Sequence, residues 1–104
     1  MAVLIIATLF PVPNQRDAVI AALEEAAEKV HASEEGTLLY APHEGPDGRL
    51  VMIEKYADDA AVAAHRSGAG LAGLVAALDG KLSVPMDVQV LTPHPAGSAE
   101  KGTL

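Results

Sequence analysis

The sequence has no cysteine and no tryptophan, and only one phenylalanine and two tyrosines occur among its 104 residues. Without cysteine, the chain cannot form disulfides, thiolate metal sites or a cysteine nucleophile. Basic residues are also scarce, because 7 Lys and Arg stand against 14 Asp and Glu, giving a formal net charge of −7. Since phosphate backbones and anionic lipids attract basic surfaces, we expect binding to neither nucleic acid nor membranes.

Long hydrophobic runs are absent as well. No apolar stretch approaches the roughly 20 residues that a membrane-spanning helix requires. The opening "MAVLIIATLFPVP" is apolar, but it has neither a basic leading region nor a small-residue cleavage pattern. These patterns predict a soluble, cytoplasmic protein.

Aliphatic residues and alanine dominate what is present. Half of the residues are hydrophobic, so a chain of this length can form one domain with a core of Ala, Val, Leu and Ile. An alanine-rich core buries little apolar area per residue, which makes a lone domain of this size marginally stable. Association with a second copy would relieve that weakness.

The apolar periodicity predicts an α+β fold of the ferredoxin-like type, with the order β-α-β-β-α-(α)-β and a four-stranded antiparallel sheet. Asn14 and either Asp58 or Asp59 are candidate helix N-caps, and "GAG" at 68–70 is expected to interrupt the second helical region. The expected strands are 2–10, 37–43, 49–56 and 84–92; the expected helices are 14–32, 59–67 and a short one over 71–80. We expect a single domain over 1–93 and a flexible tail over 94–104.

The first expected strand is apolar on both of its faces. Val3, Ile5 and Leu9 alternate with Leu4 and Ile6 along it. Two or three helices can cover only one face of a four-stranded sheet. We therefore expect a second copy of the chain to cover the other face, forming a homodimer with the two sheets facing each other.

Three segments resemble a known family. These are "EEGTLLYAPHEG", "RLVMIEKYADDAAVAAHRSG" and "MDVQVLTPHP", and in this order they are similar to the antibiotic biosynthesis monooxygenase domain, most of all to its quinol monooxygenase type, over about residues 3–93. The resemblance implies a dimeric α+β barrel with a pocket in each subunit between sheet and helices. It also implies that the chain could oxidise phenolic, quinol or polyketide molecules with molecular oxygen and without metal or flavin.

The sequence departs from the family pattern in two places. Where many members have a second histidine and an aromatic residue, this chain has Gly70 and Leu71. The residues of the haem-degrading branch are replaced by Ala7 or Thr8, by His65 and by Val75, so haem degradation is not expected. The family also includes enzymes that isomerise small carbonyl compounds, so membership does not fix the reaction.

Four residues are candidates for the site. His65 could be a general base or proton shuttle, or instead a structural helix histidine bonded to a carbonyl or to Glu54. Tyr40 and Tyr56 could orient a substrate oxygen, or they could simply pack their rings and expose their hydroxyls. Glu54 could support His65 in binding substrate, or form a structural hydrogen bond or a pair at the dimer interface.

The remaining polar residues point to no cofactor. The histidines, including His43 and His94, have no compact ligand spacing, so no metal site is expected. No motif for flavin, haem or nicotinamide is present, and the acidic run over 24–35 is interpreted as a solvated helix face.

Three functions remain open from the sequence. The leading hypothesis is a cofactor-independent monooxygenase that oxidises a small aromatic, quinol-like or polyketide-type molecule with O2. The alternatives are a non-oxidative isomerase or lyase on the same fold, and a dimeric small-molecule-binding protein without turnover.

Overall fold

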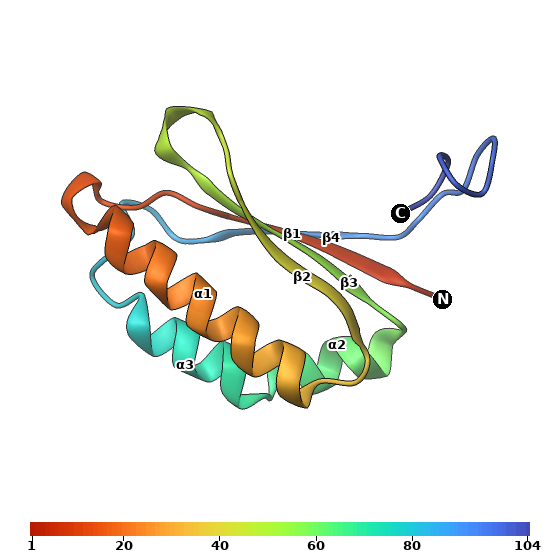
Figure 1. Ribbon diagram of the computed structural model, residues 1–104, viewed down its shortest axis with the longest axis horizontal. Helices are drawn as coiled ribbons and strands as arrows, with labels where there is room; N and C mark the ends of the chain where they lie inside the picture. Colours follow the sequence, from red (N-terminus) through yellow and green to blue (C-terminus); the bar gives the residue numbers. More distant parts are fainter.

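The computed structural model describes residues 1–104, and it shows a four-stranded sheet with all three α-helices on one of its faces (Figure 1). The elements are β1 (Val3–Leu9), α1 (Arg16–Ser33), β2 (Thr37–Glu44), β3 (Leu50–Tyr56), α2 (Asp59–Arg66), α3 (Ala69–Ala77) and β4 (Asp87–Leu91). This order confirms the predicted ferredoxin-like α+β fold.

The sheet has the strand order β2-β3-β1-β4, and every neighbouring pair is antiparallel. β1 is therefore central, with Ile6 paired to Ile53 of β3 on one side and to Gln89 of β4 on the other. β4 is an edge strand, and Val88 and Val90 remain about half exposed because no helix extends over them.

The core lies between the sheet and the helices. Its larger cluster joins β1, β2 and β3 to α1 and α3, and α1 supplies six buried residues at helical spacing: Val19, Ala22, Leu23, Ala26, Ala27 and Val30. A smaller cluster of Ile5, Tyr56, Ala61 and Val62 lies under α2. Along β3, Glu54 falls between Met52 of the larger cluster and Tyr56 of the smaller one.

Two predicted boundaries were wrong. Asn14 is not a helix N-cap, because it belongs to a short 3-10 turn (Pro13–Gln15) and α1 begins after it without a side-chain capping bond. The last strand begins at Asp87 rather than at residue 84, and Pro85 in the excluded segment has no N–H to donate to a sheet. By contrast, the Asp58 side chain accepts a hydrogen bond from Ala61 N at 2.8 Å, so the predicted cap of α2 is confirmed.

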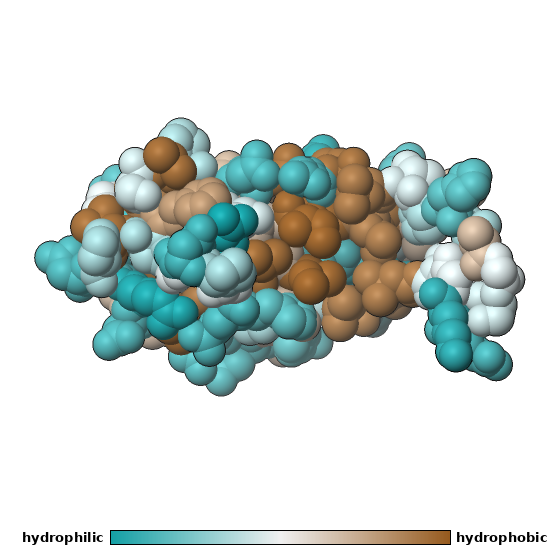
Figure 2. Space-filling view, turned by 90° about the horizontal axis from the view of Figure 1, so that it is seen from above, coloured by the Kyte–Doolittle hydropathy of each residue, from teal (hydrophilic) through white to brown (hydrophobic).

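The outer face of the sheet has no helix on it. Figure 2 looks onto this face, and apolar side chains gather over the middle of the sheet. The strand pairings place Leu4, Ile6, Val51 and Ile53 there, all partly exposed. After β4 the chain projects beyond the sheet and ends with the Leu104 carbonyl accepting a hydrogen bond from Lys55 Nζ at 2.7 Å (Figure 1). None of the helices has the length and apolar character needed to cross a membrane.

Candidate functional site

The structure brings all four predicted site residues together on the helix-facing side of the sheet. Alternation along β3 points Glu54 and Tyr56 toward the helices, and Tyr40 of β2 is paired directly with Glu54. His65 approaches them from the last turn of α2. Glu54 therefore lies inside the subunit, so the expectation that it could form a pair at a sheet-to-sheet dimer interface was wrong.

His65 is the centre of this group and is only 4% exposed. Its Nδ1 lies 2.8 Å from Glu34 Oε1, and its Nε2 lies 3.9 Å from Glu54 Oε1. The rings of Tyr40 and Tyr56 flank the imidazole, with centroids 5.2 and 5.3 Å from its own. A titratable ring is thus held between two carboxyl groups and two phenols, which is an arrangement suited to moving a proton.

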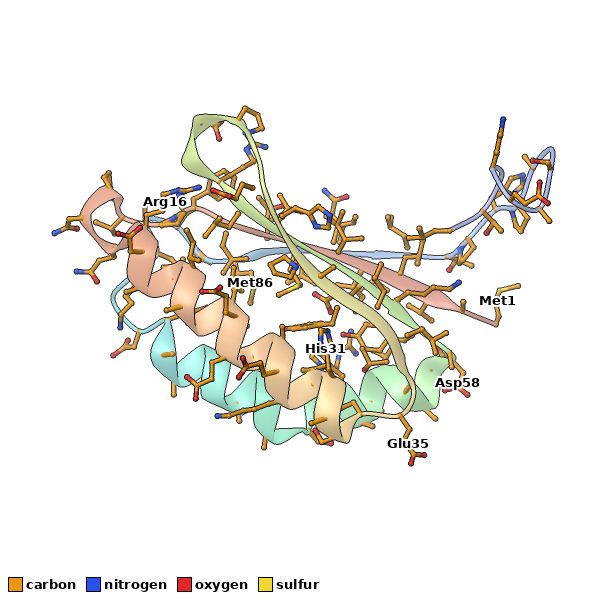
Figure 3. All side chains as sticks on the ribbon, viewed as in Figure 1. Met1, Arg16, His31, Glu35, Asp58 and Met86 are labelled. Atoms are coloured by element: carbon orange, nitrogen blue, oxygen red, sulfur yellow. The ribbon has the colours of Figure 1, made fainter.

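Glu34 is the site residue that the sequence analysis missed. It follows α1 directly as its C-cap residue, and its Oε1 also accepts a hydrogen bond from Thr37 Oγ1 at 2.9 Å. Its side chain is only 9% exposed, so the interpretation of the acidic run as a solvated face was wrong for this residue. The adjacent Glu35 is exposed and points away from the body of the protein (Figure 3). Nothing in the local pattern distinguishes the two glutamates.

Burial governs the protonation of the other acids in the group. It raises the pKa of Glu54, although the hydrogen bond from the Tyr56 hydroxyl and the charge of His65 act in the opposite direction. Burial also raises the pKa values of Tyr40 and Tyr56, and the nearby carboxylates add to this effect. Both phenols consequently stay protonated and remain hydrogen-bond donors near neutral pH.

A pocket of about 160 Å³ adjoins this group, between the sheet and the helices. Ten of its 13 lining residues are hydrophobic, and the polar wall consists of Tyr40, Glu54, His65 and Arg66. The hydrophobic residues are Ile5, Ala7, Leu9, Leu23, Met52, Leu71, Leu74, Met86 and Val88, with Tyr40 counted among the ten. Figure 3 shows Met86 between the sheet and the helices. The exposed lining residues, Arg66 and Val88, mark where the pocket reaches the surface.

Tyr56 has a different position from the one expected. It is fully buried and is not part of the pocket wall. Its hydroxyl donates to Glu54 Oε1, so Tyr56 can act on a pocket ligand only through Glu54. Arg66, which the sequence analysis did not select, is the one guanidinium on the pocket wall.

The other histidines lie outside the pocket. His31 is bonded through Nε2 to the Tyr40 carbonyl at 2.9 Å and so fixes β2 to the end of α1, while His43 and His94 are exposed. No three His, Asp or Glu side chains are grouped so as to hold a metal ion. At Gly70, where the family pattern has a second histidine, an added Cβ would lie 2.8 Å from Val30 Cγ2. The close packing of α3 on α1 therefore leaves His65 as the single histidine of this site.

Comparisons with known proteins agree with this architecture. A family model described as antibiotic biosynthesis monooxygenase matches residues 2–76. The protein Rv0793 from Mycobacterium tuberculosis is 30% identical, with a TM-score of 0.86 over 94% of this chain and 100% of that one. Among curated proteins, none matches the sequence significantly.

More distant structures share the fold. A Caulobacter crescentus CB15 protein assigned to the antibiotic biosynthesis monooxygenases is 23% identical, with a TM-score of 0.82 over 86% of this chain and 87% of that one. NE2512 from Nitrosomonas europaea, a protein of unknown function, is 24% identical, with a TM-score of 0.79 over 92% and 96% of the two chains. At this level of identity the similarity concerns the fold alone.

Proposed function

Since this chain belongs to the antibiotic biosynthesis monooxygenase family, we propose that it is a cofactor-independent monooxygenase that oxidises a small aromatic, quinol-like or polyketide-type molecule with O2. The observation that carries the proposal is the apolar pocket whose polar wall contains the buried His65 and Glu54. Its volume of about 160 Å³ and its hydrophobic walls suit a single compact ring, since an apolar cavity of about 150 Å³ can hold benzene.

In such a reaction the substrate is itself the reductant. It first loses a proton and becomes an electron-rich anion that reacts with O2. We assign the removal of that proton to Nε2 of His65, which lies 3.9 Å from Glu54 on the same wall. The apolar walls exclude water from the anion.

The developing negative charge on the substrate oxygen needs hydrogen-bond donors. Tyr40 lines the pocket, and its raised pKa keeps the phenol proton available for donation. Arg66 supplies a permanent positive charge where the pocket meets the surface. Donors of this kind stabilise an oxyanion most strongly in a site with little water. We assign Tyr40 and Arg66 to substrate orientation, and Tyr56 to holding Glu54.

One observation favours a second function, a non-oxidative isomerase. Two proton carriers, Glu54 and His65, share one wall of the pocket. Such a pair could remove a proton from one carbon of a carbonyl compound and return it to another without oxygen. The geometry serves either reaction, because both begin by forming an enolate or phenolate.

We further propose that the working unit is a homodimer with the outer sheet faces in contact. The support is the helix-free apolar face formed by Leu4, Ile6, Val51 and Ile53 (Figure 2). An exposed apolar patch over the middle of a sheet is typical of a surface that a second subunit covers.

Oxygen uptake tests the proposed activity. The purified protein would be mixed with a panel of phenols, quinols and polyketide-like ring compounds while O2 and substrate are followed together. Consumption of both supports the monooxygenase. Conversion of substrate without O2 consumption supports the isomerase, and saturable binding without conversion would leave a binding protein and contradict both enzymatic functions.

A further inference from the structure

We propose that Glu34 is the positioning residue of His65: its buried carboxylate fixes the imidazole proton on Nδ1 and leaves Nε2 free on the pocket side, and Glu34 lies beside a surface groove separate from the pocket. The catalytic meaning of this arrangement rests on the proposed function. The tautomer itself is a property of the unliganded protein and can be tested without any turnover.

The contacts of Glu34 Oε1 determine which nitrogen of His65 carries the proton. This oxygen lies 2.8 Å from His65 Nδ1 and 2.9 Å from Thr37 Oγ1, and an ionised carboxylate can only accept hydrogen bonds. Nδ1 must therefore be the protonated nitrogen. In the neutral ring Nε2 then has a free lone pair directed toward Glu54, which lines the pocket as His65 does.

The second carboxylate oxygen of Glu34 lies at the start of α3. Glu34 Oε2 is the one buried side-chain polar atom of the protein without a hydrogen-bond partner. It lies against the start of α3, since a Cβ added to Gly68 or Gly70 would come 3.1 or 3.7 Å from it. The amide groups at a helix start carry partial positive charge and favour an anion.

Of the "GAG" segment, Gly68 is the N-cap residue that separates α3 from α2, whereas Gly70 lies inside α3. Gly68 leaves the space that this oxygen occupies beside α3, because a Cβ there would lie 3.1 Å from it. The other titratable groups that face His65 are Glu54, Tyr40 and Tyr56, all from the sheet side. Glu34 is the only acid that faces Nδ1, and His65 is its only ion-pair partner.

Glu34 also lies on a different surface feature from the pocket. An open groove of about 580 Å³ is lined by Glu34, Gly36, Thr37, Ala64 and Gly68, together with neighbouring residues. His65 lines the pocket but not this groove, whereas Glu34 lines the groove but not the pocket. The imidazole consequently separates the two, with Nε2 directed to the pocket and Nδ1 to the groove side.

Nitrogen-15 NMR of the ligand-free protein tests the tautomer. We expect the His65 signals of the native protein at neutral and higher pH to show a protonated Nδ1 and a bare Nε2. In Glu34→Gln the ring should become a mixture of tautomers, because a glutamine amide can either donate or accept. The matched control Glu35→Gln changes an exposed neighbour and should leave the signals unchanged. A protonated Nε2 in the native protein, or an unaltered tautomer in Glu34→Gln, overturns the proposal.

Chemical rescue tests the groove. In Glu34→Ala the carboxylate is missing, and formate entering through the groove should restore the native nitrogen signals in a saturable way, whereas chloride at the same ionic strength should not. Absence of rescue would overturn the proposal that the groove gives access to the position of the Glu34 carboxylate. If Glu34→Ala does not fold, the native protein with isotope-labelled glutamate is measured instead. A soluble paramagnetic agent should enhance the relaxation of the Glu34 side-chain signals more than that of the Glu54 signals. Equal enhancement would overturn access to Glu34 through the groove.

Once a substrate is known, turnover provides the catalytic test. Glu34→Gln should lower kcat about 10²–10⁴-fold, because the ring no longer has one fixed tautomer and the imidazolium formed on proton transfer loses its carboxylate partner; the pH–rate profile should change as well. A Glu34→Gln enzyme with native kcat and pH profile overturns the positioning role. If instead no substrate turns over while the tautomer is as expected, the proposed function fails and the positioning geometry stands.

Discussion

Glu54 is a buried carboxyl group whose surroundings favour its neutral form, and this has a consequence for stability. Its pKa is raised above the ordinary value of 4.5, mainly by burial. Folding therefore favours the protonated form relative to the unfolded chain, so the stability that Glu54 contributes is fully present below the unfolded pKa and is lost as pH rises through the folded pKa.

Glu54→Gln should remove this pH dependence, because glutamine is neutral throughout. The free energy of unfolding of the variant, relative to the native protein, should therefore increase as the pH is raised above about 4.5, the ordinary Glu value. Urea unfolding of both proteins over a series of pH values measures the difference. Parallel stability profiles across the series would show that Glu54 titrates as an ordinary exposed acid.

At the same scale, the sequence identified part of the site and could not identify the rest. His65, Glu54 and Tyr40 were selected because a polar residue in an apolar strand or helix is conspicuous. Glu34 was not selected because its burial depends on α3 folding back over the end of α1. These segments lie about 35 residues apart in the sequence, a large part of a small domain, so no local pattern indicates the contact. Arg66 was not selected because charged residues are common at helix ends and do not by themselves indicate a binding site.

At the scale of the elements, the packing of α3 on α1 depends on Gly70. An added Cβ there would lie 2.8 Å from Val30 Cγ2, and Val30 is fully buried. Gly70→Ala should therefore force the two helices apart and lower the free energy of unfolding by about 1–3 kcal/mol.

Gly73→Ala is the matched control for this prediction. It lies in the same helix, but its added Cβ would meet only Lys29 Nζ, the end of a flexible side chain, at 3.3 Å. Alanine is the better helix former by up to about 1 kcal/mol, so this variant should be as stable as the native protein or more so. Urea denaturation of both variants makes the comparison, and equal stability of the two would contradict the close approach at Gly70.

The elements themselves were largely predictable, because strand alternation and helical periodicity are local signals. The fold followed from their order, and α1, β2, β3 and α2 lie within a few residues of their expected bounds. The errors at Asn14 and at the start of β4 arose where backbone hydrogen bonding decides the boundary: a 3-10 turn replaces the cap, and Ser83 bonds back to Phe10 before the strand begins.

For the whole molecule, the homodimer remains a prediction about the outer sheet face. Ile6→Lys places a charge at the centre of that face, paired between β3 and β4, and should dissociate the dimer because an unpaired charge in an apolar interface costs several kcal/mol. Val75→Lys is the control, since Val75 is 56% exposed on α3. Sedimentation should show dimers for the native and Val75→Lys proteins and monomers for Ile6→Lys. A stable native monomer at micromolar concentration would rule the interface out.

The whole account centres on His65 as the proton-transferring group of an apolar pocket. His65→Asn is the informative change, because the asparagine amide can still donate toward Glu34 while it cannot act as a base. His43→Asn is its control, since His43 is exposed and lies outside the pocket.

Turnover per folded molecule of these two variants, with the substrate that the native protein consumes, is the most direct measurement. The account predicts a loss of about 10²–10⁴-fold for His65→Asn and native turnover for His43→Asn. A folded His65→Asn protein that retains native turnover would contradict the account and leave His65 as a structural residue.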